Sequence, residues 1–379
     1  MTCIDIIHYK YLLEDHKTIS IGGIETYITN LIHLFNKMGY KVRVFQPSSV
    51  EFQSQIGDVC VFGHKVNNVA YSRCVIGEVC KYASTQRKYD ANYITIIGSD
   101  DLIPDFYIKN SVAIQHGITW DKPRYKNESL FVAYFKRVIL NYITIKRLRN
   151  VDSIVAVDYN FLNWYRAINN LVKERVKINV IPNFAKLCEL YEKKEMGIVN
   201  IIFARRFFDY RGSIVFTKVA IKLLDAYEDK IFITFAGDGP DKCKMTEMLK
   251  GYKNIRFITY KSEDSYRIHR GQDIAVVPTL GSEGTSLSLL EAMSSQCAVV
   301  CTNVGGMTNI VIDHYNGLMV NPDESELYNA MKEVIENENL RKRLIDNGYA
   351  TVKDSFSLEL WKQRWADFIK GFERSFTTA

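Results

Sequence analysis

The 379-residue sequence lacks the signals that mark membrane-spanning, secreted and zinc-binding proteins. No uncharged apolar run approaches the ~18–20 residues that a membrane-spanning helix needs. The first ten residues are broken by Asp5 and His8, with no basic lead and no small-residue cleavage site, which argues against a secretory leader. The eight cysteines include no C-x-x-C pair, so neither a disulfide framework nor a zinc site is expected. We therefore expect a cytoplasmic protein with reduced cysteines.

Two catalytic signatures are also missing. No two aspartates stand two positions apart, so the chain has no D-x-D that could chelate Mn²⁺ or Mg²⁺ on a diphosphate. The Gly-Gly pair at 22–23 is not followed by the G-x-G-x-x-G spacing of a dinucleotide fingerprint, which counts against an NAD enzyme. No recognition motif for nucleic acid accompanies the basic residues, so we expect no nucleic-acid partner. The sequence thus predicts neither a bound metal nor a cofactor.

Apolar and charged residues make up 47% and 24% of the chain, as in ordinary globular proteins. At roughly 150 residues per domain, the length fits two domains. Short β-branched runs alternate with amphipathic segments. Most of these runs are too apolar to have a solvent-exposed face, which predicts largely parallel sheets covered on both sides. The expected strands are 4–9, 42–47, 58–63, 93–98, 111–117, 153–158, 178–183, 200–204, 231–237, 254–259, 273–279 and 298–303. The expected helices are 24–38, 127–150, 212–227, 241–250, 284–295, 324–337 and 358–379.

A polar segment at 184–197 separates two strand–helix arrays of similar size. The alternation predicts an α/β fold with two Rossmann-like, doubly wound domains that face each other across a cleft, where ligands bind beyond the carboxyl ends of the strands. The last stretch, 358–379, carries two tryptophans on one face and is expected to pack back on the body. We assign 1–183 plus 358–379 to an N-terminal domain and 184–357 to a C-terminal domain.

The stretch 278–320 carries the most specific pattern in the chain. An apolar strand runs into a loop rich in glycine and hydroxyl residues, and the loop opens a helix. Backbone N–H groups and the helix dipole favour a phosphate at such a place. Glu283 precedes the helix and Glu291 lies two turns later. Carboxylates accept hydrogen bonds well from sugar and ribose hydroxyls, whereas a capping role explains Glu283 but not Glu291 within an apolar helix face.

The same stretch resembles the C-terminal signature of retaining glycosyltransferases of family 4, which have the GT-B fold. It contains the E-x7-E pattern, a small-apolar strand, a Gly-Gly pair at 305–306 and NGLMV. Further segments resemble pieces of the family in its order, namely 22–45, 181–183, 203–212 and 235–240. The resemblance covers most of the chain and implies a GT-B enzyme that transfers a sugar from a nucleotide.

The resemblance also implies roles for residues of the C-terminal domain. Glu283 would contact hydroxyls of the donor sugar, and Glu291 would contact the ribose hydroxyls of the nucleotide. Gly237 lies in a strand-to-helix turn that either only reverses the chain or approaches the nucleotide, and Tyr260 falls where the family places its base-contacting segment. The diphosphate would be held by the main chain of Gly284, Thr285, Ser286 and Leu287.

The segment FARRFFDYRG (203–212) resembles the family's G-R-x4-K-G loop. Arg206 and Arg211 would then occupy the Arg and Lys places and neutralise the leaving diphosphate. Arg205 stands where the family usually has glycine and is the alternative match for the first arginine. Arginine in place of lysine keeps the charge but offers a planar fork of donors, which changes the contact geometry.

Three residues of the N-terminal domain are further candidates. By the resemblance, Gly22 and Gly23 would contribute phosphate and acceptor contacts. His116 ends an apolar strand, just before a glycine, and resembles the family's strand-end histidine. It would lie near the sugar and the acceptor, and a purely structural histidine is the alternative.

Basic residues gather in the first half of the chain. Residues 1–185 contain 23 Lys and Arg against 16 Asp and Glu, and 122–149 contains eight basic residues against one acid. Within 127–150, aromatic and aliphatic residues are interspersed with Lys136 and Arg137. As a helix this segment suits the interface of an anionic membrane. The alternative is a helix whose apolar side faces the core and whose basic side is exposed to solvent.

Taken with these observations, the resemblance implies a retaining hexosyltransferase that uses a UDP-, GDP- or dTDP-sugar and a glycan or lipid-linked glycan acceptor, in cell-surface polysaccharide assembly. Arginines, backbone amides and the helix dipole would meet the diphosphate charge without a metal. We expect it in the cytoplasm, as a peripheral protein of the inner membrane face if 127–150 binds lipid. The alternatives are a nucleotide-sugar epimerase of the same fold and a non-catalytic glycan-binding subunit.

Overall fold

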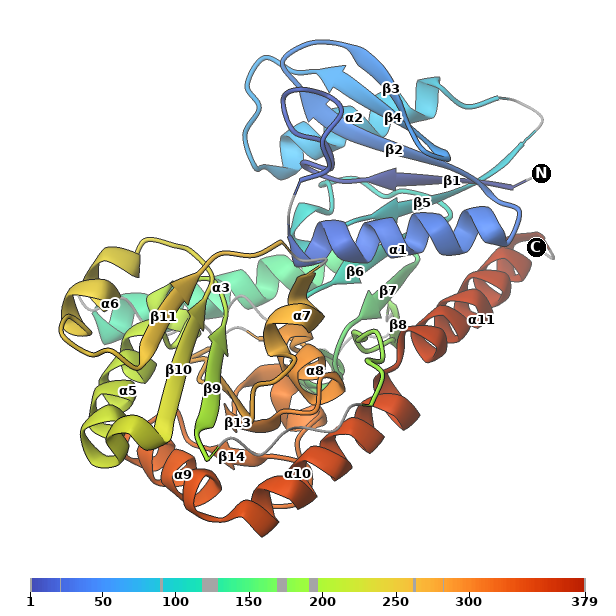
Figure 1. The fold of residues 1–379 in the computed structure, drawn as a ribbon. Helices are drawn as coiled ribbons and strands as arrows, with labels where there is room; N and C mark the ends of the chain where they lie inside the picture. Colours follow the sequence, from blue (N-terminus) through green and yellow to red (C-terminus); the bar gives the residue numbers. More distant parts are fainter. Residues whose placement is uncertain are drawn as a thin grey trace. The chain divides into compact units, whose positions relative to one another are not determined.

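The computed structural model describes residues 2–20, 22–88, 91–117, 129–168, 176–190, 197–261, 264–281 and 283–377. The chain forms two compact units. The first consists of Met1–His116, Glu128–Ile181 and Lys362–Ala379, and the second of Gly117–Asn127 and Pro182–Trp361. Each unit contains one sheet with helices packed on it (Figure 1). The expected α/β fold with two parallel-sheet domains is confirmed.

The first unit is built on an eight-stranded sheet with the order β3-β4-β2-β1-β5-β6-β7-β8. Its strand pairs are parallel except β3 with β4. The bounds are β1 (Thr2–Ile7), β2 (Lys41–Ser48), β3 (Phe52–Ile56), β4 (Val59–Lys65), β5 (Asn92–Ile97), β6 (Ser111–Gln115), β7 (Ser153–Ala156) and β8 (Lys177–Val180). The central strands β1, β5, β6 and β7 are almost wholly buried, as expected of strands covered on both faces.

The helices of the first unit are those predicted by the amphipathic pattern, together with two that it did not single out, α2 and α4. Within α1, Tyr27, Leu31 and Phe35 repeat at helical spacing and are buried. Gly39, with a φ of 88°, follows the end of that helix. The bounds are α1 (Gly23–Lys37), α2 (Arg73–Thr85), η1 (Asp100–Leu102), α3 (Leu130–Leu148), α4 (Tyr159–Ile168) and α11 (Leu358–Thr377), of which the part from Lys362 onward belongs to this unit.

The last helix, α11, packs through the apolar face that its sequence predicts. Trp365 and Ile369 are fully buried, and the indole N–H of Trp365 donates to the hydroxyl of Tyr27 at 2.7 Å. At the start of the helix, the ring of Trp361 lies 4.4 Å from that of Phe184 within the second unit. The return of the final helix to the body of the protein is therefore confirmed.

The second unit is built on a six-stranded parallel sheet with the order β11-β10-β9-β12-β13-β14. Successive residues of β9 point to opposite faces, because Ile201 and Phe203 join one buried cluster and Ile202 and Ala204 join the other. Both faces are thus covered, as expected. The bounds are β9 (Val199–Ala204), β10 (Ile231–Ala236), β11 (Ile255–Ile258), β12 (Ile274–Val277), β13 (Ala298–Thr302) and β14 (Leu318–Val320).

Helices α5, α6, α9 and α10 contribute to the first of these clusters, and α8 with the turns η6 and η7 to the second. No helix in the described part of the chain is long and apolar enough to cross a bilayer. The bounds are η3 (Asp209–Arg211), α5 (Ser213–Tyr227), η4 (Glu228–Lys230), α6 (Lys242–Met248), α7 (Ser265–His269), α8 (Leu287–Ser294), η6 (Gly305–Asn309), α9 (Glu324–Glu336), α10 (Glu338–Thr351) and η7 (Val352–Phe356).

Two boundaries differ from the sequence pattern in ways that matter for the site. The helix expected at 284–295 begins at Leu287, so the three preceding residues form part of the loop after β12. The segment expected as a polar linker begins with buried residues: Phe184 and Ala185 are 7% and 3% exposed, and Ala185 pairs with Ser357. The start of this segment is therefore a fixed part of the second unit, and 191–196 lies outside the described residues.

Candidate active site

Glu283 lies beyond the carboxyl ends of the strands of the second sheet, in the loop between β12 and α8, and its carboxylate is buried among cations. The Arg205 guanidinium donates from Nη2 to Glu283 Oε2 at 2.6 Å, and Arg211 Nη1 contacts the same oxygen. Thr279 Oγ1 also donates to it, at 3.2 Å. Two guanidiniums against one carboxylate leave this cluster with a net positive charge, which suits an anionic ligand.

The arginines keep Glu283 ionised. Burial by itself raises the pKa of this carboxyl group, but the charges of Arg205 and Arg211 outweigh burial and hold the pKa below its ordinary value. The influence is mutual: burial opposes the charge on Arg211, yet Glu283 raises the pKa of that guanidinium above its ordinary value. For Arg205, burial outweighs the charge of Glu283 and lowers the pKa of the guanidinium, but this pKa starts so far above 7 that Arg205 keeps its charge. All three groups are charged at neutral pH.

Two glycines allow neighbouring loops to close on this cluster. Gly237 follows β10 with a φ of 149°, and a Cβ there would lie 2.0 Å from the backbone oxygen of Arg205. Gly305 has a φ of 54°, and a Cβ there would lie 2.0 Å from the backbone oxygen of Glu283. Any side chain at either position would push the arginine or the carboxylate out of place. Gly237, which the sequence marked as a candidate, therefore packs against the backbone of Arg205.

The structure brings Arg205, and not Arg206, into contact with Glu283. Arg205 follows β9 directly and is 8% exposed, and its Nη1 also lies within hydrogen-bond distance of Ser286 and Ser288. Arg206 is exposed, and its guanidinium carbon lies 5.7 Å from the ring centre of Phe208. Of the two arginines that the sequence left open, Arg205 is therefore the one that joins Arg211.

Glu291 lies on α8, and Tyr260 lies within the electrostatic reach of both Glu291 and Arg205. The Ser265 hydroxyl donates to Glu291 Oε2 at 2.5 Å. Burial, and then the charge of Glu291, raise the pKa of the Tyr260 hydroxyl, whereas Arg205 acts on it in the opposite direction. Tyr260 therefore lies near enough to both Glu291 and the arginine that holds Glu283 for their charges to act on its hydroxyl. The two acids of the E-x7-E pattern lie on one side of the second unit.

The loop between the two acids is fixed from both sides. Thr285 and Ser286 are buried, and the side-chain amide of Asn183 donates to the backbone oxygen of Thr285 at 2.7 Å. Gly284 packs closely against Gly306, where a Cβ would lie 2.4 Å from the Gly284 carbonyl carbon. This places the loop at the start of α8, whose first N–H groups have no acceptor within the helix, and Leu287 is its first residue.

The ionisation of Glu291 gives a pH-dependent prediction. Burial raises the pKa of this carboxyl group to about 7. The unfolded chain releases the proton near pH 4.5 and the folded chain only near 7, so stability is lost as the pH rises through this window. Glu291→Gln removes the free-energy cost of burying an ionised carboxylate. At pH 8 we therefore expect the variant to be more stable than the wild type by about 1–3 kcal/mol in urea unfolding. As a control, Glu247→Gln at an exposed position should give the wild-type dependence of the unfolding free energy on pH. If Glu291→Gln also gave the wild-type dependence, the raised pKa of Glu291 would be contradicted.

In the first unit, His116 lies where its sequence position predicts, at the end of β6. Its Nε2 lies 2.9 Å from the backbone oxygen of Gly98, so this nitrogen carries the proton. The ring also makes an edge contact with Tyr27, with 5.1 Å between the ring centres. Burial lowers the pKa of His116 to about 4, so the imidazole is neutral at physiological pH.

Two residues of this edge were missed by sequence reasoning. His8 follows β1, and its Nε2 lies 3.2 Å from Oε1 of Glu25, in the first turn of α1. The carboxylate of Glu25 folds over Gly22, where a Cβ would lie 2.1 Å from Oε2, and Gly23 opens the helix. Burial raises the pKa of Glu25, but His8 outweighs it and lowers the pKa. A histidine at a strand end and an acid directly after the Gly-Gly pair were the available signals.

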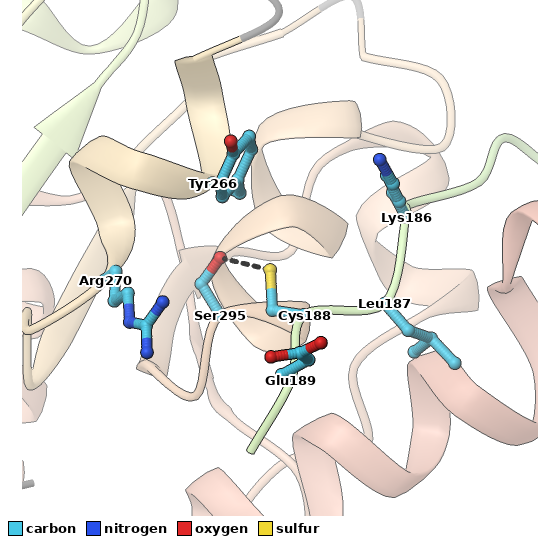
Figure 2. A pocket seen from close by; sticks show the side chains of 7 residues that line it. All are labelled: Lys186, Leu187, Cys188, Glu189, Tyr266, Arg270 and Ser295. Atoms are coloured by element: carbon cyan, nitrogen blue, oxygen red, sulfur yellow. Dashed lines mark hydrogen bonds between the residues drawn. The ribbon is translucent and has the colours of Figure 1, made fainter. Parts of the chain in front are cut away.

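Two hollows in the described part of the chain lie beside these clusters or away from them. One of about 700 Å³ in the first unit is lined by residues of 9–16 and 46–50 and by Val69, next to the carboxyl ends of β1 and β2. Another, of about 260 Å³ in the second unit, is lined by 186–189, Tyr266, Arg270 and Ser295, at the carboxyl end of α8 (Figure 2). It contains none of the candidate residues. Within the described ranges, no group of three or more His, Cys, Asp and Glu could hold a metal ion.

The chain is similar to known glycosyltransferases. An uncharacterised glycosyltransferase of Methanocaldococcus jannaschii is 24% identical over 390 residues, which cover 93% of this chain and 95% of the relative. WaaG, a glycosyltransferase involved in lipopolysaccharide biosynthesis, has a TM-score of 0.72 at 12% identity, over 97% of this chain and 100% of that one. Anabaena HepE, solved in complex with UDP, has a TM-score of 0.67 at 13% identity, over 97% of this chain and 100% of that one.

These likenesses define the fold as GT-B. Residues 192–351 match the family model of glycosyl transferases group 1. The C-terminal part of the chain therefore carries the domain of glycosyl transferases group 1, and the fold is GT-B, as the resemblance of its sequence implied.

Proposed function

We propose that this glycosyltransferase moves a hexosyl unit from a nucleotide diphosphate sugar to a glycan or lipid-linked glycan, with retention of configuration and without a metal, in cell-surface polysaccharide assembly at the cytoplasmic face of the membrane. The cluster of Glu283, Arg205 and Arg211 carries the proposal. It combines a net positive charge with an ionised carboxylate, beside a loop that opens a helix. The positive charge suits a diphosphate, and the ionised carboxylate suits the hydroxyl groups of a sugar.

The donor would be held from three directions. Arg205, Arg211 and the backbone N–H groups of 284–287 would bind the diphosphate. Among the described residues, the donors to Glu283 all approach Oε2, which leaves Oε1 for a hydroxyl of the sugar. Glu291 would accept hydrogen bonds from the ribose hydroxyls, which could replace the Ser265 hydroxyl as its donor.

The acceptor would bind to the first unit. Because Nε2 of His116 donates to Gly98, Nδ1 presents a lone pair that could accept a hydrogen bond from an acceptor hydroxyl. The Gly22–Gly23 helix start and the nearby hollow supply polar groups and space for a glycan. WaaG acts in lipopolysaccharide biosynthesis, which supports a glycan acceptor attached to lipid.

The transfer would be driven by stabilisation of the leaving group. The bond from the anomeric carbon to the diphosphate oxygen breaks, and the acceptor oxygen bonds to that carbon from the same face. The hydroxyl proton passes to the departing diphosphate oxygen. Arg205 and Arg211 meet the charge that develops on this diphosphate, the role that the sequence analysis gave to Arg206 and Arg211. HepE was solved with UDP, which supports a nucleotide diphosphate as the product.

A ligand screen tests the proposal. Thermal unfolding with UDP-, GDP- and dTDP-sugars, in buffer with EDTA, should show stabilisation by one nucleotide class, by about 2.7 kcal/mol at a hundred times the Kd. Transfer of the sugar to a glycan should then continue in EDTA. Interconversion of the donor sugar without an acceptor would instead indicate an epimerase. Binding of glycan with no response to any nucleotide sugar would indicate a non-catalytic subunit.

A further inference from the structure

Helix α3 exposes most of its apolar side chains to solvent. Among the described residues, 21 large hydrophobic side chains are exposed, and nine of them lie on this single helix. The exposed fractions include 76% for Leu130, 72% for Phe131 and 69% for Tyr142. The alternative from the sequence, a helix whose apolar side packs on the core, does not describe it, because Leu148 is its only fully buried residue. So much apolar surface on one element marks an interaction site.

Four of the exposed side chains form a continuous stripe. Phe131, Phe135, Val138 and Tyr142 follow one another at intervals of three or four residues, so they share a face over about three turns. The helix is attached at its other end, where Leu148 is buried and Arg147 Nη1 donates to the backbone oxygen of Asp101 at 3.1 Å. The stripe therefore projects from an anchored helix.

The charges on α3 itself are all of one sign. From 130 to 149 the chain has no acidic residue, and Lys136, Arg137 and Lys146 are exposed. Long basic side chains beside an apolar stripe can reach lipid phosphates while aromatic and aliphatic groups enter the acyl boundary. A second copy of the helix would bring like charges together, and a nucleic acid would leave the stripe in water. The charges thus favour an anionic bilayer as the partner.

We propose that α3 binds the surface of an anionic lipid bilayer, lying in the plane of the interface. Its anchor at Asp101 is part of η1, which follows β5, and His116 follows the neighbouring strand β6. The lipid-binding helix is therefore fixed to the edge of the first unit that holds His116. If the proposed function holds, this arrangement brings that edge to a lipid-linked acceptor. Lipid binding itself does not depend on catalysis.

Sedimentation with vesicles tests the proposal without donor or acceptor. The full chain should pellet with vesicles of phosphatidylcholine and phosphatidylglycerol, much less with phosphatidylcholine alone, and less at high salt. Phe131→Ser with Phe135→Ser should reduce the binding constant at least about tenfold. Lys136→Gln with Arg137→Gln should reduce it about tenfold on anionic vesicles.

The matched control is Ile312→Ser with Tyr315→Ser, which removes two apolar side chains that are 64% and 51% exposed in the second unit. It should bind vesicles as the wild type does, and all variants should unfold at the wild-type temperature. Equal binding to neutral and anionic vesicles, or full binding by the double Phe variant, would overturn the proposal. So would a dimer in light scattering that disappears with the Phe substitutions, since a second copy would then cover the stripe.

Discussion

Replacing Glu283 by alanine is expected to lower the free energy of unfolding at neutral pH by about 3–5 kcal/mol. The reason is the burial of its partners: Arg205 is 8% exposed and Arg211 shares the same carboxylate oxygen. Without the carboxylate, two cations remain close together in a site largely shielded from water. Urea titration followed by circular dichroism measures the loss.

The loss should depend on pH with a definite sign. Burial raises the pKa of Glu283, but Arg205 and Arg211 outweigh it, so the folded pKa is below the ordinary value of 4.5. As the pH falls, the unfolded chain takes up the proton first. The stabilisation is therefore complete well above pH 4.5 and is lost as the pH falls through the folded pKa. The difference in unfolding free energy between the wild type and the variant should therefore become smaller as the pH falls below about 4.

Two further variants separate charge from general damage. Glu283→Gln keeps the size of the side chain and an oxygen that can accept from Arg205, so it should cost less than alanine. Glu247→Ala removes an acid from an exposed position on α6 and should stay within about 0.5 kcal/mol of the wild type. An alanine variant at 283 as stable as the one at 247 would show that the carboxylate does not hold the arginines in place.

Much of this site follows from strand periodicity and the E-x7-E spacing, but the choice between two adjacent arginines does not. In FARRFFDYRG the motif spacing favours Arg206. The structure instead places Phe207 in the core, fully buried against Phe203 and Phe257. Because that ring points inward, Arg206 next to it points outward. Two neighbouring Phe residues give no sequence signal for which of them is buried.

Other elements were missed for related reasons. Strand β3 reads FQSQI, with three consecutive polar residues, and such a run suits an antiparallel edge strand in which no residue is fully buried. The His8–Glu25 pair joins residues that are 17 positions apart, through the adjacency of β1 and α1. Spacing along the chain does not show such contacts. The exposure of α3 was equally open in the sequence, since a basic amphipathic helix fits both a core and an interface.

The arginine assignment gives the largest expected effect on catalysis. Arg205→Ala and Arg211→Ala should each lower kcat by about 10²–10³-fold, since each removes a charge that would stabilise the leaving diphosphate. Arg206→Ala should keep kcat near the wild-type value, because its guanidinium lies over Phe208 rather than on Glu283. The measurement is transfer at saturating donor and acceptor, for the donor class identified by thermal unfolding.

Folding must be separated from chemistry, because both buried arginines also contact Glu283. Arg205→Lys and Arg211→Lys keep the charge, so they should remain folded while losing the fork that suits a diphosphate. An intermediate kcat for the lysine variants, with unfolding temperatures close to the wild type, would identify the arginines as groups that act on the substrate. If Arg206→Ala lost kcat and Arg205→Ala kept it, the motif spacing would be the better guide, and the cluster on Glu283 would serve the fold alone.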